Sequence, residues 1–166
     1  VKPQRSLFSK NSDTKLPLAS ITKLMTTLLA HELISEDETS TIELSAIKQE
    51  GSSGLLVGEE MTTEELTSLA LIASSNDAAY ALAANVGLRL GPSDPIAQFI
   101  RGMNIRAKEL GLDTLEFYST TGLDLSLTEP GALGSARDVT LLLEYIITKY
   151  PEIIAPTQLA ETRVYN

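Results

Sequence analysis

Apolar residues recur at helical spacing along most of the chain, and the first clear stretch follows Pro17. From Leu18 to Ile34 the large apolar residues return at steps of three and four, the period of one face of an α-helix. Proline is tolerated in the first turn of a helix because its missing N–H would have no partner there. The pattern therefore predicts an amphipathic helix over residues 18–34, with His31 in its last part, where a cation suits the helix dipole.

The next helical stretch opens with a capping box. Thr62 precedes Glu65 by three residues, and apolar residues follow at helical spacing. The stretch runs into four polar residues, Ser74-Ser75-Asn76-Asp77, after which the apolar pattern resumes. Polar side chains between buried helical pieces are costly unless they are paired. These four residues therefore either begin a new helix, capped by Asp77 or Ser75, or serve a function, and the periodicity leaves both interpretations open.

Two more helices follow in the second half of the chain. One starts at Ser93-Asp94-Pro95 and stops at Gly111, a typical C-terminal cap residue. The other begins at Ser135, carries Asp138 three residues later and ends before Pro151. Strand signals are few, so the pattern predicts a mainly helical domain. The short strand candidates lie at residues 6–9, 41–44, 115–118 and 161–165.

Composition narrows the class of protein. The 166 residues carry 13 basic and 22 acidic side chains, a formal net charge of −9, and 43% of them are hydrophobic. This length and apolar content fit one domain with one core. The basic residues form no cluster, which argues against nucleic-acid binding. No apolar run approaches the roughly 18 residues of a membrane span, so we expect no membrane anchor within this chain.

The absence of cysteine and the presence of a single histidine exclude several kinds of chemistry. Disulfides, thiolate metal sites and a cysteine nucleophile all need cysteine, and a multi-histidine metal site needs more than His31. The chain also lacks a glycine-rich phosphate-binding loop. We therefore expect neither a metal nor an organic cofactor, and the remaining candidates for chemistry are serines activated by a lysine.

Three serines precede a lysine by three residues, a spacing that places a hydroxyl and an amine one helical turn apart on one face. The pairs are Ser12 with Lys15, Ser20 with Lys23, and Ser45 with Lys48. Only Ser20 and Lys23 lie in the first turns of a strongly apolar helix, where burial would lower the lysine pKa and the helix N-terminus would favour an alkoxide on Ser20. A helix-start serine beside a lysine that reaches out to solvent is the alternative, and the spacing by itself leaves it open.

The residues around Ser20 resemble a known motif. Residues 17–26 closely resemble the first motif of the serine D-alanyl-D-alanine carboxypeptidases, the low-molecular-mass penicillin-binding proteins. Their sequence is Pro17-Leu18-Ala19-Ser20-Ile21-Thr22-Lys23-Leu24-Met25-Thr26. The family's Ser-x-Asn motif resembles Ser74-Ser75-Asn76. Later family landmarks are similar to Met103-Asn104, Thr121-Gly122-Leu123 and Ser135-Ala136-Arg137-Asp138. The similarity follows the family's order along nearly the whole chain, which chance does not produce.

This resemblance implies a fold and a reaction. The expected fold is α+β, of the penicillin-binding-protein and β-lactamase-like type, with this chain mainly its helical lobe and few short strands. The implied reaction removes the terminal D-alanine from a peptidoglycan stem peptide ending in D-Ala-D-Ala, through an acyl-enzyme, and β-lactams such as penicillin acylate the same serine. By resemblance, Ser20 is the nucleophile, Lys23 the general base and Ser74 a proton relay. Asn76 orients the substrate and helps to keep Lys23 in place. The substrate implies an extracytoplasmic location, periplasmic or at the cell surface.

The family's third motif, Lys-Thr-Gly on a sheet strand, is absent from residues 1–166. By resemblance, that strand binds the substrate carboxylate and donates the second N–H of the oxyanion hole. We therefore expect residues 1–166 to be a partial carboxypeptidase domain that lacks this strand. One alternative is a non-catalytic wall-binding or partner-binding fragment of the same fold. The other is a β-lactamase-like hydrolase, because Glu129-Pro130 resembles a deacylating segment, although Leu133 stands where that segment needs asparagine.

Overall fold

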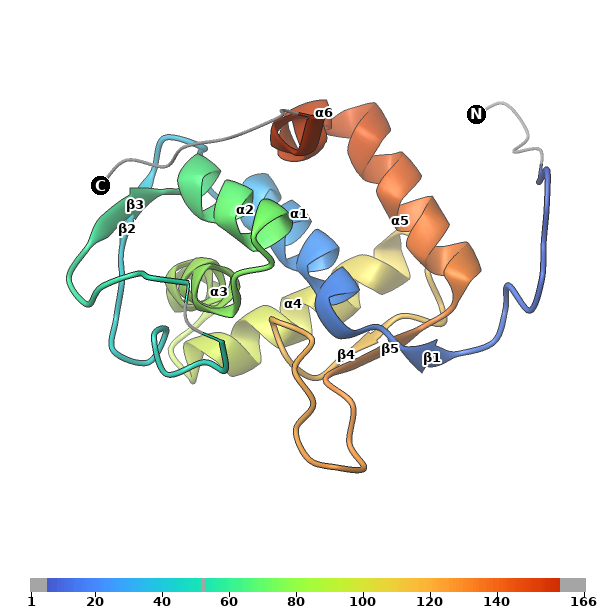
Figure 1. The fold of residues 1–166 in the computed structure, drawn as a ribbon, viewed down its shortest axis with the longest axis horizontal. Coiled ribbons are helices and arrows are strands. Elements are labelled where there is room, and N and C mark those ends of the chain that lie inside the picture. The colour runs from blue at the N-terminus through green and yellow to red at the C-terminus, as the bar shows by residue number, and fades with distance from the viewer. Residues whose placement is uncertain (1–5, 52, 159–166) are drawn as a thin grey trace.

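The computed structural model describes residues 6–51 and 53–158, and its core is built mainly of helices (Figure 1). In chain order the helices are the 3₁₀ turn η1 (Ala19–Thr22), α1 (Lys23–Leu33), α2 (Thr63–Ile72), α3 (Asn76–Leu90), α4 (Pro95–Glu109), α5 (Ala136–Lys149), α6 (Pro151–Ile154) and the 3₁₀ turn η2 (Ala155–Gln158). The strands are β1 (Leu16–Pro17), β2 (Thr39–Thr41), β3 (Glu60–Thr62), β4 (Glu116–Phe117) and β5 (Ala132–Gly134). These elements match the expected helical lobe with few short strands.

The strands form two small antiparallel sheets. One sheet has the order β1-β5-β4, with Leu16 opposite Gly134 and Phe117 opposite Ala132. The other pairs β2 with β3, and its central pair is Ser40 with Met61. The first sheet brings the chain directly before η1 next to β5, so it fixes the point at which the first helical segment begins.

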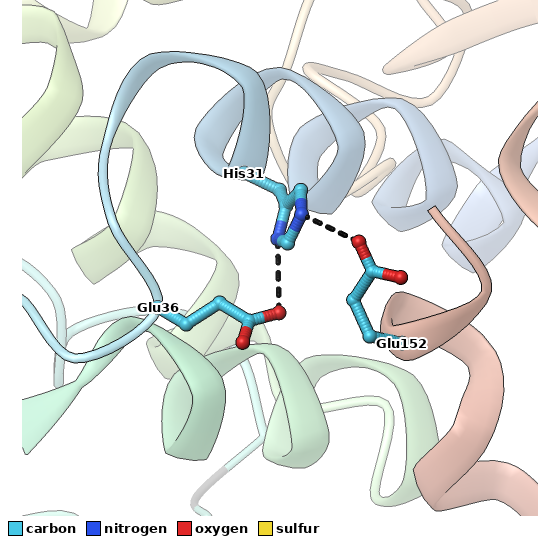
Figure 2. A group of neighbouring side chains, drawn as sticks. All are labelled: His31, Glu36 and Glu152. Atoms are coloured by element: carbon cyan, nitrogen blue, oxygen red, sulfur yellow. Dashed lines mark ion pairs between the residues drawn. The ribbon is translucent and has the colours of Figure 1, made fainter. Parts of the chain in front are cut away.

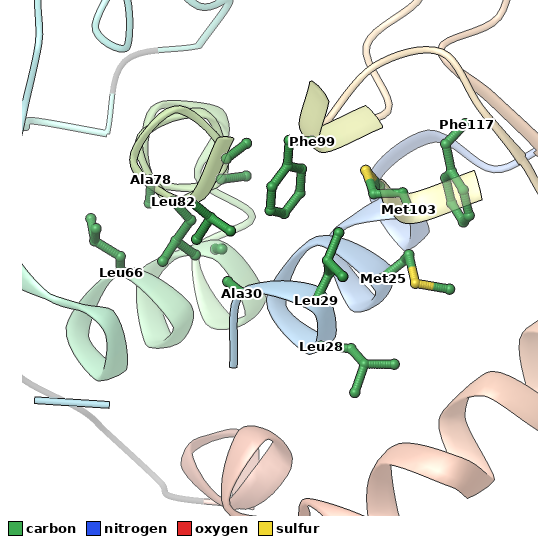
Figure 3. Close-up of a cluster of buried hydrophobic side chains, with 14 of the residues drawn as sticks. Met25, Leu28, Leu29, Ala30, Leu66, Ala78, Leu82, Phe99, Met103 and Phe117 are labelled. Atoms are coloured by element: carbon green, nitrogen blue, oxygen red, sulfur yellow. The ribbon is translucent and has the colours of Figure 1, made fainter. Parts of the chain in front are cut away.

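Helix α1 passes through the middle of the helical group, and the other helices lie around it (Figure 1). Its apolar side chains are buried together with residues of α2, α3, α4 and β4 in one cluster (Figure 3). The cluster includes Met25, Leu28, Leu29, Leu66, Ala78, Leu82, Phe99, Met103 and Phe117. Burial of apolar area from these and other elements is the main stabilising contribution of this core. Because α1 is enclosed on several sides, any polar side chain on it must find a partner inside the protein.

Local capping signals predicted the helix starts well. The Thr62 hydroxyl accepts from the backbone N–H of Glu65, and the Glu65 carboxylate accepts from the backbone N–H of Thr62, which completes the capping box. Asp94, within the predicted start at residues 93–95, caps α4, and Ser135 caps α5 as predicted. Among the four polar residues between α2 and α3, Ser75 is the cap of a new helix, because its hydroxyl accepts from a backbone N–H of the first turn.

The predicted start of the first helix is wrong. Pro17 belongs to β1, and the backbone N–H of Leu18 donates to the carbonyl of Ala132. The α-helix begins only at Lys23, after the 3₁₀ turn η1. A pairing with a strand more than 100 residues later overrides the proline signal, which is purely local.

The strand predictions had mixed outcomes. Residues 6–9 form no strand, and the segment predicted at 41–44 lies earlier, at Thr39–Thr41. The candidate at 115–118 is confirmed as β4. The candidate at 161–165 lies outside the described residues. Short strands such as β1 and β5 have too few residues to show an alternating pattern, so periodicity cannot predict them.

His31 lies in the last turn of α1, as predicted, and connects that end of the helix to two other segments (Figure 2). Its Nδ1 atom is 3.4 Å from a carboxylate oxygen of Glu36, and its Nε2 atom is 2.9 Å from one of Glu152 in α6. Its ring also packs against the Tyr150 ring in a T-shaped arrangement. This arrangement fixes α6 next to the end of α1.

No helix within the described ranges combines the length and the apolar character that a bilayer crossing needs.

The packing of α3 against α4 depends on Gly87, and this gives a test of the fold. Alanine normally stabilises a helix interior by about 1 kcal/mol relative to glycine. A Cβ atom on Gly87 would lie 2.0 Å from the carbonyl oxygen of Pro95, so we expect Gly87→Ala to destabilise the protein by about 1–3 kcal/mol. Chemical denaturation of the wild type and the variant measures this difference.

Gly102→Ala is the matched control in α4. Its Cβ atom would approach only side-chain ends, 3.1 Å from Leu29 and 3.6 Å from Leu90, and these can move. We expect Gly102→Ala to change stability by less than about 1 kcal/mol. Equal stability of the two variants would contradict the close approach of α3 and α4.

Candidate active site

Ser20 and Lys23 meet at the start of α1. Ser20 is exposed in η1, directly after Ala19, whose φ of 47° is in the left-handed region. Lys23 is the first residue of α1, and only 1% of it is exposed. Its Nζ atom lies 3.0 Å from the Ser20 hydroxyl oxygen and 3.0 Å from the carbonyl oxygen of Thr121. The alternative of a lysine that reaches out to solvent therefore does not hold.

Burial lowers the pKa of Lys23 to about 8, because the charged ammonium loses its hydration inside the protein. No ion pair among the described residues includes this lysine, so no carboxylate opposes the shift. With this pKa, roughly 10% of Lys23 is neutral at pH 7. A neutral amine 3.0 Å from a hydroxyl can accept its proton, which is the condition for a general base.

Ser74 comes to the same point from a distant part of the sequence. It lies between α2 and α3, is exposed, and has a φ of 55°. Its hydroxyl donates to the Ser20 hydroxyl oxygen across 2.9 Å. The Ser20 oxygen thus contacts both the Lys23 amine and the Ser74 hydroxyl. The structure brings these three predicted site residues together in one hydrogen-bonded group.

Asn76 lies beside this group but contacts a different segment. It is the first residue of α3, and its side-chain nitrogen donates to the carbonyl oxygen of Glu50 at 2.6 Å. The second partner of Lys23 is the Thr121 carbonyl, and no hydrogen bond among the described residues joins Lys23 to Asn76. The segment that holds Lys23 in this structure is therefore the one around Thr121.

The segment at residues 119–123 is a part of the site whose role the sequence did not reveal. The Thr121 carbonyl accepts from Lys23, and the Thr120 carbonyl accepts from the hydroxyl of Thr26, one turn further along α1. Backbone carbonyls carry no side-chain signature, so residue types alone could not identify them. The glycine at position 122 was the available signal, because it has a φ of 86° and passes close to Ala19.

The other two serine–lysine pairs are not joined in the structure. Lys15 forms an ion pair with Glu116, and the Ser12 hydroxyl bonds to its own exposed neighbours. Ser45 and Lys48 are both exposed. Only Ser20 and Lys23, among the three pairs, combine direct contact with a buried amine.

Two further groups could have carried chemistry. His31, Glu36 and Glu152 have ligand atoms within 4.8 Å of one another, the spacing of a possible metal site within the described part of the chain. Each ring nitrogen faces a different carboxylate, however, so both nitrogens of His31 already have a partner within the protein (Figure 2). Glu129 is exposed and accepts from Ser126, and no hydrogen bond of the described residues connects it with Ser20.

Comparison with known proteins identifies the family. The family model described as D-alanyl-D-alanine carboxypeptidase matches residues 2–165. The chain belongs to this family. The matched range includes both motifs and the segment that contains Thr121, so the family predicted from the sequence is confirmed.

Individual relatives of this D-alanyl-D-alanine carboxypeptidase family member are similar to it over most of the chain. D-alanyl-D-alanine carboxypeptidase DacF of Bacillus subtilis is 37% identical over 153 residues, which are 89% of this chain and 36% of DacF. A D-alanyl-D-alanine endopeptidase of Pseudomonas aeruginosa is 34% identical over 140 residues, 82% of this chain and 42% of that protein. The chain thus spans well under half the length of these curated relatives.

A solved structure confirms the fold class. Penicillin-binding protein D2 of Listeria monocytogenes, in its ampicillin-bound form, matches with a TM-score of 0.71 and 30% sequence identity. The match covers 93% of this chain and 61% of that protein. The family member therefore has the expected penicillin-binding-protein fold, of which its helices and short strands form a part.

The close approach at Gly122 gives a test of how the site is held together. A Cβ atom at this position would lie 1.8 Å from the Ala19 carbonyl oxygen and 2.8 Å from the Thr22 hydroxyl. Gly122→Ala should therefore push the segment around Thr121 away from η1. We expect a loss of about 2–4 kcal/mol in stability, the sum of left-handed strain and the steric conflict.

Gly58→Ala is the matched control. Gly58 has nearly the same φ, 85°, but nothing lies within 4 Å of its Cβ position. Its substitution should cost only the backbone strain, about 1 kcal/mol. Thermal unfolding of both variants separates strain from contact, and equal losses would count against a tight junction between η1 and Gly122.

Proposed function

We propose that this chain carries the serine nucleophile and the proton-transfer groups of a D-alanyl-D-alanine carboxypeptidase. The observation that supports the proposal most is the contact of the Ser20 hydroxyl with a buried lysine amine and a second serine hydroxyl. The substrate is a peptidoglycan stem peptide that ends in D-Ala-D-Ala. Family membership supports the substrate class, and the geometry supports the role of each residue.

The first half-reaction forms an acyl-enzyme. Neutral Lys23 takes the proton of the Ser20 hydroxyl, and the Ser20 oxygen attacks the carbonyl carbon between the two D-alanines. The tetrahedral intermediate collapses when the carbon–nitrogen bond breaks. The leaving D-alanine amine receives a proton through the Ser74 hydroxyl, which is replenished from the Lys23 ammonium. Lys23 is then neutral again, and the shortened peptide is esterified to Ser20.

The second half-reaction uses the same groups on water. Lys23 accepts a proton from a water molecule, which attacks the ester carbon. Ser20 leaves as the hydroxyl after taking that proton back. The net result is hydrolysis of one peptide bond with no change in the protein. Asn76 is proposed to orient the substrate amide, because it lies two residues from Ser74 at the start of α3.

We also propose that residues 1–166 are a partial catalytic domain. Residues 1–166 contain no Lys-Thr-Gly motif, which in this family would bind the substrate carboxylate and supply one oxyanion-hole N–H. The loss of one such donor typically lowers kcat by about 100- to 1000-fold. Full activity is therefore proposed for the complete gene product that includes these residues.

The location and the inhibitors follow from the same proposal. Peptidoglycan is outside the cytoplasmic membrane, so the protein is proposed to act in the periplasm or at the cell surface. β-Lactams are proposed to acylate Ser20. A relative of the same fold, penicillin-binding protein D2 of Listeria monocytogenes, is seen with ampicillin and with cefotaxime, which supports this part of the proposal.

The first test is covalent labelling of the full-length gene product with a fluorescent penicillin. We expect a stable adduct on Ser20, located by peptide mass spectrometry, and no adduct in Ser20→Ala. Ser45→Ala is the control, because Ser45 is exposed and has no contact with its lysine, and it should label like the wild type. Absence of labelling in the wild type would favour a non-catalytic binding role.

A second measurement separates the reactions of the family. The enzyme without a β-lactam label should release free D-alanine from a pentapeptide stem. Cleavage of a cross-linked stem-peptide dimer without D-alanine release would instead indicate an endopeptidase, the activity named for the relative from Pseudomonas aeruginosa.

The pH dependence of acylation tests the role of Lys23. Because burial lowers the pKa of Lys23 to about 8, the neutral fraction rises with pH up to and through that value. The acylation rate should rise about fivefold between pH 7 and pH 8 and level off above pH 9. A rate that still rises tenfold per unit above pH 9 would indicate a lysine with an ordinary pKa.

Arginine substitution provides the control for this profile. Lys23→Arg keeps the positive charge but cannot lose its proton, so acylation should fall by at least 1000-fold at every pH. Lys48→Arg changes an exposed lysine and should leave the profile unchanged.

A further inference from the structure

The start of α3 is held by a buried carboxylate that the reaction itself does not use. Asp77 is only 2% exposed, although its side chain is strongly polar. Its Oδ2 atom accepts from the backbone N–H of Ser53 at 3.2 Å and from the Ser53 hydroxyl at 2.7 Å. The Ser75 hydroxyl donates to the Ser53 oxygen at 2.7 Å. We call Asp77, Ser53 and Ser75 the α3 clamp.

The α3 clamp surrounds the second motif. Ser75, Asn76 and Asp77 are consecutive, and each bonds to Ser53 or to Glu50. The Asn76 amide nitrogen donates to the Glu50 carbonyl oxygen, so the amide oxygen remains free to accept from another group. The clamp therefore fixes the position of the helix start, and the adjacent bond to Glu50 fixes the orientation of the Asn76 side chain.

Ser74 needs such support because of its backbone. Its φ of 55° is in the left-handed region, which costs a non-glycine residue about 1–2 kcal/mol. Strained residues persist only where their surroundings hold them. The next residue, Ser75, is fixed by the clamp and by a hydrogen bond from its N–H to the Leu69 carbonyl. The Ser74 hydroxyl is thereby held 2.9 Å from the Ser20 oxygen.

The clamp is not an efficient way to gain stability. The Asp77 Oδ1 atom is buried and has no hydrogen-bond partner among the described residues. An unsatisfied buried acceptor lowers stability, and for a charged group the loss is larger. The other such atom in the described part of the chain, the Thr22 hydroxyl oxygen, lies next to Lys23. Both unpaired atoms are thus directly beside predicted site residues.

The same arrangement recurs at the start of α5, away from the site. Asp138 Oδ2 accepts from the backbone N–H of Thr114 at 2.8 Å and from the Thr114 hydroxyl at 2.7 Å. The Thr114 and Ser135 hydroxyl oxygens are 2.8 Å apart, and Ser135 caps α5 as Ser75 caps α3. Asp138 is 6% exposed, and its group contacts none of the predicted site residues by any hydrogen bond among the described residues. We call Asp138, Thr114 and Ser135 the α5 clamp.

We propose that Asp77 is a positioning residue, which acts through Ser53 to align the Ser74 hydroxyl and the Asn76 amide with Ser20. The inference rests on the proposed function for its catalytic consequence. The α5 clamp serves only the fold. Two groups with the same chemistry and nearly the same burial therefore have different consequences when they are removed.

The test compares Asp77→Ala with Asp138→Ala in the full-length gene product. Each variant removes one buried carboxylate that accepts two hydrogen bonds, so we expect similar decreases in the unfolding temperature. We expect Asp77→Ala to lower the rate of acylation by a fluorescent penicillin at least tenfold, and Asp138→Ala to change it less than twofold. Asp77→Asn should recover part of the rate, because its amide oxygen can accept the same two bonds.

A milder pair of substitutions keeps the inference testable if the aspartate variants fail to fold. Ser53→Ala removes only the hydroxyl of the α3 clamp and leaves the backbone N–H bond to Asp77. Thr114→Ala is its counterpart in the α5 clamp. The acylation rate should fall in the first variant and not in the second. Equal losses of acylation rate in Ser53→Ala and Thr114→Ala would overturn the inference. An unchanged acylation rate in both Asp77→Ala and Ser53→Ala would overturn it as well.

A readout that does not depend on activity distinguishes this inference from the proposed function. The side-chain amide resonance of Asn76 should shift and broaden in Asp77→Ala and stay in place in Asp138→Ala. If the wild type is not acylated, the proposed function fails, and this resonance alone decides whether the clamp positions Asn76. An unchanged Asn76 resonance in Asp77→Ala would refute the positioning role whatever the acylation rate.

Discussion

The burial of the Lys23 amine is the constraint on which the geometry of this site depends. A lysine that is 1% exposed needs acceptors within the protein, and it finds them in the Ser20 hydroxyl and the Thr121 carbonyl. These contacts join the start of α1 to a segment almost 100 residues later in the chain. Thr26, also fully buried, donates to the Thr120 carbonyl one turn further along α1. One face of the central helix thus supplies the amine and anchors the segment that holds it.

The sequence predicted those features of the fold that are determined by neighbouring residues. The capping box at Thr62, the cap at Asp94 and the cap at Ser135 are hydrogen bonds between residues two or three positions apart, so residue type and spacing suffice to find them. Strand β1 could not be found in this way. It has two residues and exists because Leu16 and Pro17 pair with β5, more than 100 residues later. Such a pairing leaves no periodic pattern in either segment.

The candidate site, like the fold, could be predicted from spacing only where it depends on neighbouring residues. Ser20 and Lys23 lie one turn apart, and their spacing in an apolar helix indicated the contact. The family resemblance, and not the spacing, indicated that Ser74 would join them, since a left-handed serine between two helices has no signature of its own. The Thr121 and Glu50 carbonyls were beyond prediction, because every residue carries a backbone carbonyl and only the tertiary fold selects two of them.

Strain and unsatisfied polar atoms are concentrated where the chemistry is proposed. Of the three non-glycine residues with left-handed φ in the described ranges, Ala19 and Ser74 adjoin or belong to the site. The low pKa of Lys23 is another cost to stability that falls at this site. A decrease from 10.5 to about 8 corresponds to about 3 kcal/mol of stability lost below pH 8, and this loss declines as the pH rises toward 10.5. A fold selected for stability alone would place a leucine at position 23. The lysine, the strained backbone and the half-paired Asp77 occur together around Ser20, whose hydroxyl lies 3.0 Å from the Lys23 amine and 2.9 Å from the Ser74 hydroxyl. In the proposed mechanism, their shared effect is to hold Ser20 between a base and a proton donor before any substrate binds.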